Sequence, residues 1–151
     1  MQKYAYIVLN LEKFWTRLCQ QNKAGKQKHA FVRRGLVGPK NVQKLFFYVT
    51  HPTQEIQGYA DFVERVTGRS KDLWESLGEE SLLHSFDEYN DFLQQRKTAT
   101  FVRFTNLKIF PKPVPYKVTL SILEKERMPQ MGMYLTEKMA KQLFSEGGVK
   151  L

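Results

Sequence analysis

The run KLFFYVT at residues 44–50 restricts the fold of this chain more than any other stretch. It is apolar at almost every position, so the strand that it predicts must be covered on both faces by other parts of the chain. Further β-rich apolar runs predict its neighbours. They lie at residues 4–9, 28–34, 55–66, 99–107 and 131–136. The sequence therefore predicts about six strands.

Helical segments interrupt these strands at irregular intervals. The predicted helices cover residues 11–22, 70–78, 85–96, 118–123 and 136–144. Ser85 and Glu88 match a capping box at the start of the third of them. Because helices do not follow every strand, the pattern excludes a doubly wound parallel sheet. It favours an α+β fold, a small mixed or antiparallel β-barrel of five or six strands with helices at its ends.

A single domain over residues 1–151 suits a chain of this length, with residues 70–96 as a helical insertion between two strands. Gly58, inside the fourth predicted strand, indicates a bulge or a close approach by another backbone. The prolines of PKPVP at residues 111–115 predict a rigid loop after the fifth strand. The tail that begins at Ser145 is expected to fray.

The charge of the chain is unevenly distributed. The net charge is +9, with +9 on residues 1–50, −7 on residues 51–95 and +7 on residues 96–151. Lys and Arg side chains concentrated on one surface attract polyanions, and contacts to phosphates supply most of the non-specific affinity for nucleic acid. A basic protein that binds nucleic acid is therefore expected, and the alternative is a solvated basic surface that keeps the protein soluble.

The stretch GKQKHAFVRRG places Lys26, Lys28, Arg33 and Arg34 around a short apolar strand. Arg is suited to bidentate contacts with a phosphate or a base edge. Because side chains alternate along a strand, Arg33 and Arg34 should point to opposite faces, so that at most one enters a given cleft. The alternative role for Arg33 is a structural salt bridge with an acid of the fourth predicted strand.

Four other parts of the chain supply further candidates for a nucleic-acid site. Thr50 and His51 end a strand and can present hydrogen-bonding groups to a polar ligand, although a His at such a position also serves as a structural cap. Arg127 precedes a Met-rich run that could line a cleft for a flat base. Bases also stack on aromatic side chains. The candidates for the cleft walls are Trp15, Tyr48, Tyr59 and Met131, with packing in the core as the alternative.

The segments GKQKHAFVRR, KLFFYVT and EIQGYADFVERVTG, in this order, resemble the core of the PUA-like superfamily, which includes the ASCH and EVE-type modules. The later segment RMPQMGMYLTEKMAKQLF is most similar to a small, mainly archaeal PUA-like family of unknown function. The resemblance spans roughly Tyr4 to Phe144. It implies a compact barrel with a cleft beside the Gly-Lys turn. In this superfamily such clefts bind RNA, or a modified base in RNA or DNA.

One branch of the ASCH modules hydrolyses an acetylated cytidine. That branch uses a Lys in the Gly-Lys turn, a Thr shortly after it and a Glu on a later strand. Lys26 matches the Lys, whereas Lys28 or His29 occupies the position of the Thr. Glu55 and Glu64 are the candidates for the Glu. The resemblance therefore implies a catalytic role for Lys26, as nucleophile or base, only if the chain is such an amidohydrolase.

These features favour a non-catalytic module that binds RNA, or a modified nucleotide, through a cleft edged by Lys26, Arg33, Thr50 and His51. The alternatives are a hydrolase of a modified nucleoside and a protein-interaction module that docks through the helical insertion. No cofactor is expected, and the His and Cys residues have no metal-ligand spacing. The sequence has no apolar run of membrane-spanning length, and a cytoplasmic protein is expected.

Overall fold

Each predicted apolar run forms a strand in the computed structural model, which describes residues 2–150. The elements follow the order β1 (Ala5–Asn10), α1 (Glu12–Lys23), β2 (Lys28–Arg34), β3 (Lys44–Val49), β4 (Glu55–Arg69), α2 (Ser70–Leu77), α3 (Phe86–Phe92), β5 (Thr98–Pro115), α4 (Tyr116–Leu123), β6 (Met133–Leu135) and α5 (Glu137–Glu146). A 3-10 turn, η1 (Gly78–Glu80), follows α2. The predicted α+β class is confirmed.

The sheet is open, which corrects the predicted barrel. Its strands lie in the order β2-β5-β4-β3-β1-β6, so β2 and β6 are its edges. β1 pairs with β3 in parallel on one side and with β6 antiparallel on the other, where Tyr6 lies opposite Tyr134. Because a strand has only two hydrogen-bonding edges, β1 cannot also pair with β2 and close a barrel. The other neighbouring strands are antiparallel, so the sheet is mixed.

β4 and β5 form a ribbon that is longer than the sequence predicts. β5 includes the PKPVP segment, which was predicted as a loop. β2 pairs with β5 only as far as Thr105, so the second half of β5 has β4 on one side and no strand on the other. Pro111 and Pro113 fall where the pairing of β4 with β5 is irregular, between the pairs Gly58–Ile109 and Ile56–Val114. Proline is tolerated there because its missing N–H removes no ladder hydrogen bond.

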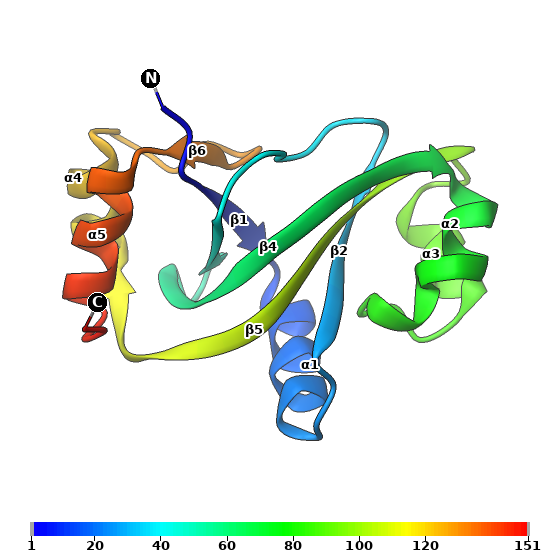
Figure 1. Ribbon diagram of the computed structural model, residues 1–151, viewed down its shortest axis with the longest axis horizontal. Coiled ribbons are helices and arrows are strands. Elements are labelled where there is room, and N and C mark those ends of the chain that lie inside the picture. Colours follow the sequence, from blue (N-terminus) through cyan, green and yellow to red (C-terminus); the bar gives the residue numbers. More distant parts are fainter. Residues whose placement is uncertain (1, 151) are drawn as a thin grey trace.

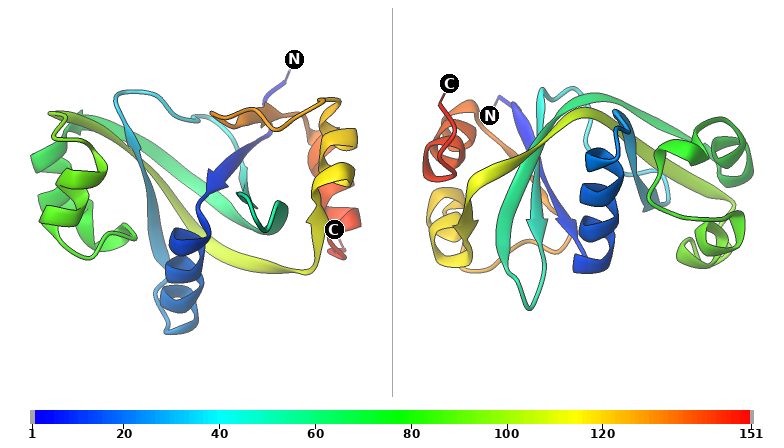
Figure 2. Two further views of the ribbon diagram at one scale, coloured as in Figure 1. Left: turned by 180° about the vertical axis from the view of Figure 1, so that it is seen from behind. Right: turned by 90° about the horizontal axis from the view of Figure 1, so that it is seen from below.

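Helices cover the two ends of the β4–β5 ribbon. α4 and α5 lie at one end and α2 and α3 at the other, with α1 between them below the sheet (Figure 1). The views in Figure 2 show the same separation from behind and from below. α2 and α3 lie within the segment predicted as a helical insertion. Within residues 2–150, no helix combines the length and the apolar character that crossing a bilayer requires.

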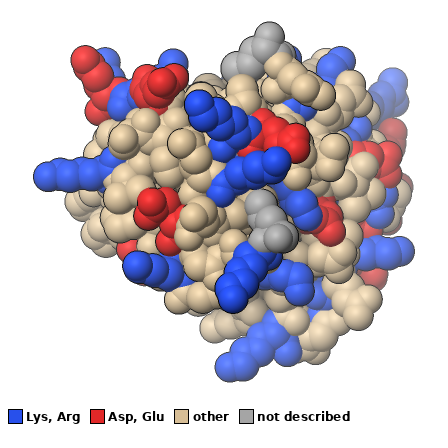
Figure 3. All heavy atoms as spheres, turned by 60° about the vertical axis from the view of Figure 1, so that its left-hand side comes forward, with Lys and Arg blue, Asp and Glu red and all other residues tan. Residues whose placement is uncertain are grey.

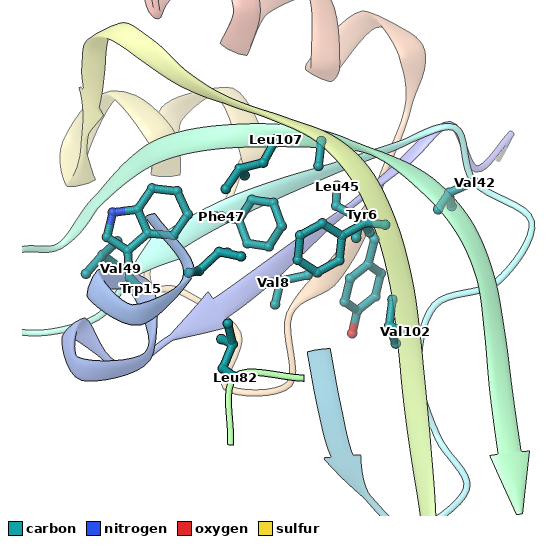
Figure 4. Packing of buried hydrophobic residues seen from close by; sticks show 13 residues of the cluster. Tyr6, Val8, Trp15, Val42, Leu45, Phe47, Val49, Leu82, Val102 and Leu107 are labelled. Carbon is teal, nitrogen blue, oxygen red and sulfur yellow. The ribbon is translucent and has the colours of Figure 1, made fainter. Parts of the chain in front are cut away.

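Three clusters of buried side chains form the core. The first lies between the sheet and α1, and Phe47 is at its centre (Figure 4). The ring of Phe47 is fully buried, with its centroid 5.6 Å from that of Trp15 and 5.0 Å from that of Phe104. The second cluster lies beneath α4 and α5, and the third beneath α2 and α3. Both faces of β3 are therefore covered, as its apolar sequence predicts.

A bidentate ion pair fastens α3 to α1. Arg17 donates from Nη1 and Nη2 to the two carboxylate oxygens of Glu88, at 2.7 Å and 2.9 Å. The same carboxylate accepts a hydrogen bond from the His84 amide at 2.8 Å. The Ser85 hydroxyl accepts from the Glu88 amide at 3.1 Å, so the predicted cap of this helix is confirmed. Glu88 thus stabilises the start of α3 and also holds the helical insertion to α1.

Stability is expected to fall in acid because of this carboxylate. Hydrogen bonds from Arg17 and the His84 amide lower the pKa of Glu88 from 4.5 to about 2. Since the unfolded chain binds the proton more readily, the contribution of Glu88 is complete above about pH 4.5 and is lost as the pH falls toward 2. Thermal melts followed by circular dichroism should give Glu88→Gln a lower Tm than the wild type at neutral pH. The two Tm values should converge in acid. A constant difference would contradict this role.

Candidate nucleic-acid interface

A cleft of about 400 Å³ lies where β2 faces β1 across the gap that keeps the sheet open. The loop between α4 and β6 contributes to its wall, and so do the start of α1 and the end of α3. The lining side chains are mostly apolar, with two arginines among them. They belong to Tyr6, Val8, Leu9, Leu11, Phe31, Val32, Arg33, Arg34, Pro39, Phe92, Gln130 and Met131.

Arg33 spans this gap between the two strands. Its guanidinium donates from Nη1 to the Tyr6 hydroxyl at 3.2 Å and from Nη2 to the Met131 carbonyl at 3.4 Å. The Tyr6 hydroxyl itself donates to the Met131 carbonyl. Side-chain hydrogen bonds therefore join the edge of β2 to β1 and to the loop that precedes β6. In a closed barrel, backbone hydrogen bonds between β1 and β2 would take their place. The alternative salt bridge of Arg33 with an acid of β4 does not form.

Arg34 lines the same cleft from its other side. Its Nε donates to the Phe92 carbonyl at 2.7 Å, and its guanidinium lies 5.1 Å from the centroid of the Phe92 ring. The expectation that only one of the two arginines could enter a given cleft is therefore wrong. Alternation does send their side chains to opposite faces, but β2 is an edge strand, and a cleft that opens along an edge can be reached from both faces.

Lys26 and Lys28 lie at the opposite end of β2 from the arginines. Lys26 is half-buried and donates from Nζ to Gln21 Oε1 at 3.0 Å and to the Ser81 carbonyl at 3.3 Å. Burial lowers the pKa of Lys26 below its usual value. The negative charges of Glu80 and Glu79 act to raise this pKa but do not offset the effect of burial. The Lys28 side chain is exposed. The two lysines and the two arginines are thus not brought together.

The residues of the hydrolase pattern are only partly assembled around Lys26. Glu64 pairs with Arg103, and Glu55 accepts a hydrogen bond from the amide of Gln57. The acids whose charges act on Lys26 are Glu80 and Glu79. No sequence signal marked Glu80, which Arg103 holds by two hydrogen bonds of 2.8 Å.

His29, one of the two candidates for the position of the Thr in the hydrolase pattern, is fully buried. Its ring stacks on Phe104, and its Nε2 lies 3.2 Å from Asn22 Oδ1. Its Nδ1 has no hydrogen-bond partner among the described residues. Burial and the charge of Lys26 lower the pKa of His29 to about 4, so the ring is neutral at pH 7. Of the two candidates, His29 thus offers a buried, neutral imidazole and Lys28 an exposed amine, and neither offers a hydroxyl.

The remaining predicted contact residues lie on separate loops. Thr50 and His51 form the turn between β3 and β4, where the Thr50 amide donates to the Asn10 carbonyl at 2.9 Å and the His51 side chain is exposed. Arg127 is exposed on the loop between α4 and β6, which also carries Met131. Neither the turn nor Arg127 lines the β1–β2 cleft.

The four predicted wall residues fall into three different places. Met131 lines the β1–β2 cleft and is 62% exposed. Trp15 and Tyr48 are only 5% and 3% exposed, which leaves little of either ring for stacking with a base. Burial raises the pKa of the Tyr48 hydroxyl to about 12. Tyr59 packs on Phe110 and lines a separate hollow on another part of the sheet.

Sequence reasoning missed the three aromatic residues of the cleft, which are Tyr6, Phe31 and Phe92. Phe31 lies two positions before Arg33 on β2, and a period of two in an edge strand is a signal that could have grouped them. Phe92 comes from α3, far away in the sequence, and only the docking of the insertion brings it to the cleft.

Two other kinds of site, a metal centre and a cysteine nucleophile, find no support among residues 2–150. No three His, Cys, Asp or Glu side chains there are grouped so that they could hold a metal ion. Burial raises the pKa of the Cys19 thiol to about 11, which disfavours the thiolate that a nucleophile requires. The β1–β2 cleft therefore remains the best candidate for ligand binding.

In sequence, the chain matches no family model and no curated protein. In structure, it is similar to the ASCH protein of Zymomonas mobilis, with a TM-score of 0.77 and 20% identity over 95% of this chain and 96% of that one. A single-residue variant of the same protein gives a TM-score of 0.78 over 95% and 98% of the two chains, at 20% identity. The protein Rpa0253 of Rhodopseudomonas palustris is a more distant match, with a TM-score of 0.54 and 13% identity over 96% and 93%.

The agreement with the Zymomonas mobilis protein covers almost the whole of both chains. It includes the segments on which the PUA-like resemblance rests, since these form β2, β3, β4 and β6. The narrower resemblance to a mainly archaeal family stays a prediction. The chain therefore has the fold of the ASCH domain, as the resemblance to the PUA-like superfamily predicts.

Proposed function

We propose that this protein is a non-catalytic module that binds RNA, or a modified nucleotide, through the β1–β2 cleft. The observation that carries the proposal is the pairing of Arg33 and Arg34 with apolar walls in one cleft of about 400 Å³. A guanidinium can contact a phosphate or a base edge with two parallel hydrogen bonds. An aromatic wall offers a stacking surface for an unpaired base.

The position of Lys26 favours binding over hydrolysis. Its amine is engaged by Gln21 and the Ser81 carbonyl, and it does not line the cleft. A nucleophile or general base must come within hydrogen-bond reach of the reacting group. A base held beside Arg33 would be separated from Lys26 by most of the length of β2, about 20 Å.

Replacing both arginines with Ala is expected to weaken binding of single-stranded RNA by about tenfold or more. The loss of two cationic contacts should also reduce the slope of log affinity against log salt by about 2. Both quantities can be measured by fluorescence anisotropy of labelled RNA and DNA oligonucleotides across a salt series.

A matched control is Lys71→Ala, which removes an exposed cation of α2 that lies outside the cleft. Arg33→Lys, which keeps the charge but loses the planar fork, separates charge from geometry. Because Arg33 also joins β2 to Tyr6, each variant is first compared with the wild type by thermal melting. Unchanged RNA affinity in a folded double variant would remove the cleft from the proposal.

A further inference from the structure

A second hollow, of about 410 Å³, lies beside the C-terminal end of α5. The second core cluster forms part of its floor, and the strands β3, β4 and β5 and the chain end border it. Its lining side chains belong to Tyr4, Lys44, Tyr59, Asp61, Asn106, Lys108, Phe144, Val149 and Lys150. They share none of the residues of the β1–β2 cleft.

The strand register explains why cations gather here. Lys44 of β3 lies opposite Asp61 of β4, and Tyr59 of β4 lies opposite Lys108 of β5. Tyr59 and Asp61 are two positions apart, so their side chains stand on the same face of β4. Three neighbouring strands thus place two lysines and one carboxylate on one face. Figure 3 looks onto this end of the molecule, where several Lys and Arg side chains lie close together.

The chain after α5 adds the third lysine. Gly148 has a φ of +78°, a left-handed conformation that L-residues with a side chain rarely adopt, and Gly147 packs so closely on the Phe110 ring that a Cβ would overlap it. The Val149 amide donates to the Phe144 carbonyl at 2.9 Å. These contacts turn the chain back over the hollow and place Lys150 in its wall. The tail predicted to fray from Ser145 is therefore held in place as far as Lys150, and Leu151 lies outside the described residues.

The acid in the hollow is already satisfied, whereas the charge of Lys108 is not. Asp61 accepts hydrogen bonds from Lys44 Nζ and, at 2.8 Å, from Asn106 Nδ2. Burial raises the pKa of Asp61, but these hydrogen bonds and the charges of Lys44 and Lys108 together lower it below its usual value. Lys108 forms no ion pair with any described residue. Three lysines against one carboxylate leave a net charge of +2 in the lining.

We propose that this hollow binds a phosphate group. A phosphate near neutral pH carries between one and two negative charges, which matches the excess positive charge of the lining. Lys108 supplies a charge that forms no ion pair within residues 2–150, and the hydroxyl of Tyr59 can donate beside it. The volume exceeds that of the anion alone, so the phosphate can belong to a free phosphomonoester or to the backbone of a nucleic acid. The site is independent of the arginine cleft.

The test is a titration of ¹⁵N-labelled protein followed by amide chemical shifts. The probes are inorganic phosphate, adenosine 5′-monophosphate and, as the uncharged control, adenosine. Both phosphates should shift the amides of Asp61, Lys108, Gly148 and Val149, and adenosine should not. Lys108→Gln should weaken phosphate binding by about tenfold, the loss expected for one charge-assisted hydrogen bond.

A variant that is expected to strengthen phosphate binding complements Lys108→Gln, which is expected to weaken it. Asp61→Asn removes the only acid among the described residues of the lining and releases Lys44, so it should bind phosphate more tightly than the wild type. The Lys44–Asp61 pair is partly exposed, so its loss should cost the fold little. Lys71→Gln, outside the hollow, is the matched control for Lys108→Gln. Absence of shifts at these amides with phosphate would overturn the proposal, as would shifts that neither hollow variant changes.

Two further measurements identify the source of the phosphate and separate this hollow from the β1–β2 cleft. If nucleic-acid backbone occupies the hollow, Lys108→Gln should reduce the salt slope for RNA by about 1. If the ligand is a free phosphomonoester, the RNA slope should not change, while binding of adenosine 5′-monophosphate should weaken. The Arg33 and Arg34 variants should leave the phosphate-induced shifts intact, so failure of one site does not imply failure of the other.

Discussion

Replacing Phe47 with Ala is expected to lower the free energy of unfolding by about 3–5 kcal/mol. The ring has no exposed surface and lies between Trp15 and Phe104, with centroid distances of 5.6 Å and 5.0 Å. Its removal leaves a cavity between α1 and the sheet, because the backbones on both sides are held by the β3–β4 ladder and by the helix (Figure 4). Urea unfolding followed by tryptophan fluorescence and circular dichroism measures the change.

The matched control is Phe86→Ala. This ring is 41% exposed at the start of α3, so its truncation removes much less buried surface. We expect the control to lose less than half of what Phe47→Ala loses. Similar losses for the two variants would mean that the packing around Phe47 relaxes to fill the space.

Gly58→Ala is expected to destabilise the protein by about 1–3 kcal/mol through overpacking. A Cβ at Gly58 would lie 2.7 Å from the backbone oxygen of Lys108 and 2.8 Å from Cη2 of Trp15. The carbonyl belongs to the β5 ladder and cannot move without breaking the pairing of β4 with β5. The Trp15 ring is held by a hydrogen bond from Nε1 to Gln57 Oε1 at 2.8 Å. Unfolding in urea should show a lower midpoint.

Gly68→Ala in the same strand is the control. Its nearest neighbours would be side-chain atoms of Leu73 at 4.0 Å, which is ordinary van der Waals contact. We expect this variant to be as stable as the wild type or slightly more so, because Ala restricts the unfolded chain. If Gly58→Ala proved equally harmless, the approach of Lys108 and Trp15 to β4 would be looser than the structure has it.

Much of the fold could be predicted from local patterns. Apolar runs predicted the six strands, because burial on a sheet demands such residues whatever the partner strand is. Ser85 caps α3, since a cap depends only on residues a few positions apart. Gly58 marks both a register shift and a close backbone approach, as its place in a strand predicts. The order of the segments was enough for the PUA-like resemblance.

The candidate sites could be predicted only in part. Arg33 and Arg34 were recognised from their chemistry, but Phe31 and Phe92 beside them were not. Lys26 was grouped with the arginines because it is near them in sequence, whereas the length of β2 separates them in space. Adjacency along a strand says little about adjacency in a site.

The sequence by itself determined where most of the strands and helices form, that β3 is covered on both faces, and that the chain carries an excess of cations. The tertiary structure decided which strands pair. β6 occupies the edge of β1 that a barrel would use for β2, and this choice opens the cleft that Arg33 spans. It also decided that Lys44, Lys108 and Lys150 share one hollow. Local preferences act over a few residues, whereas strand pairing depends on edges contributed by segments far apart in the chain.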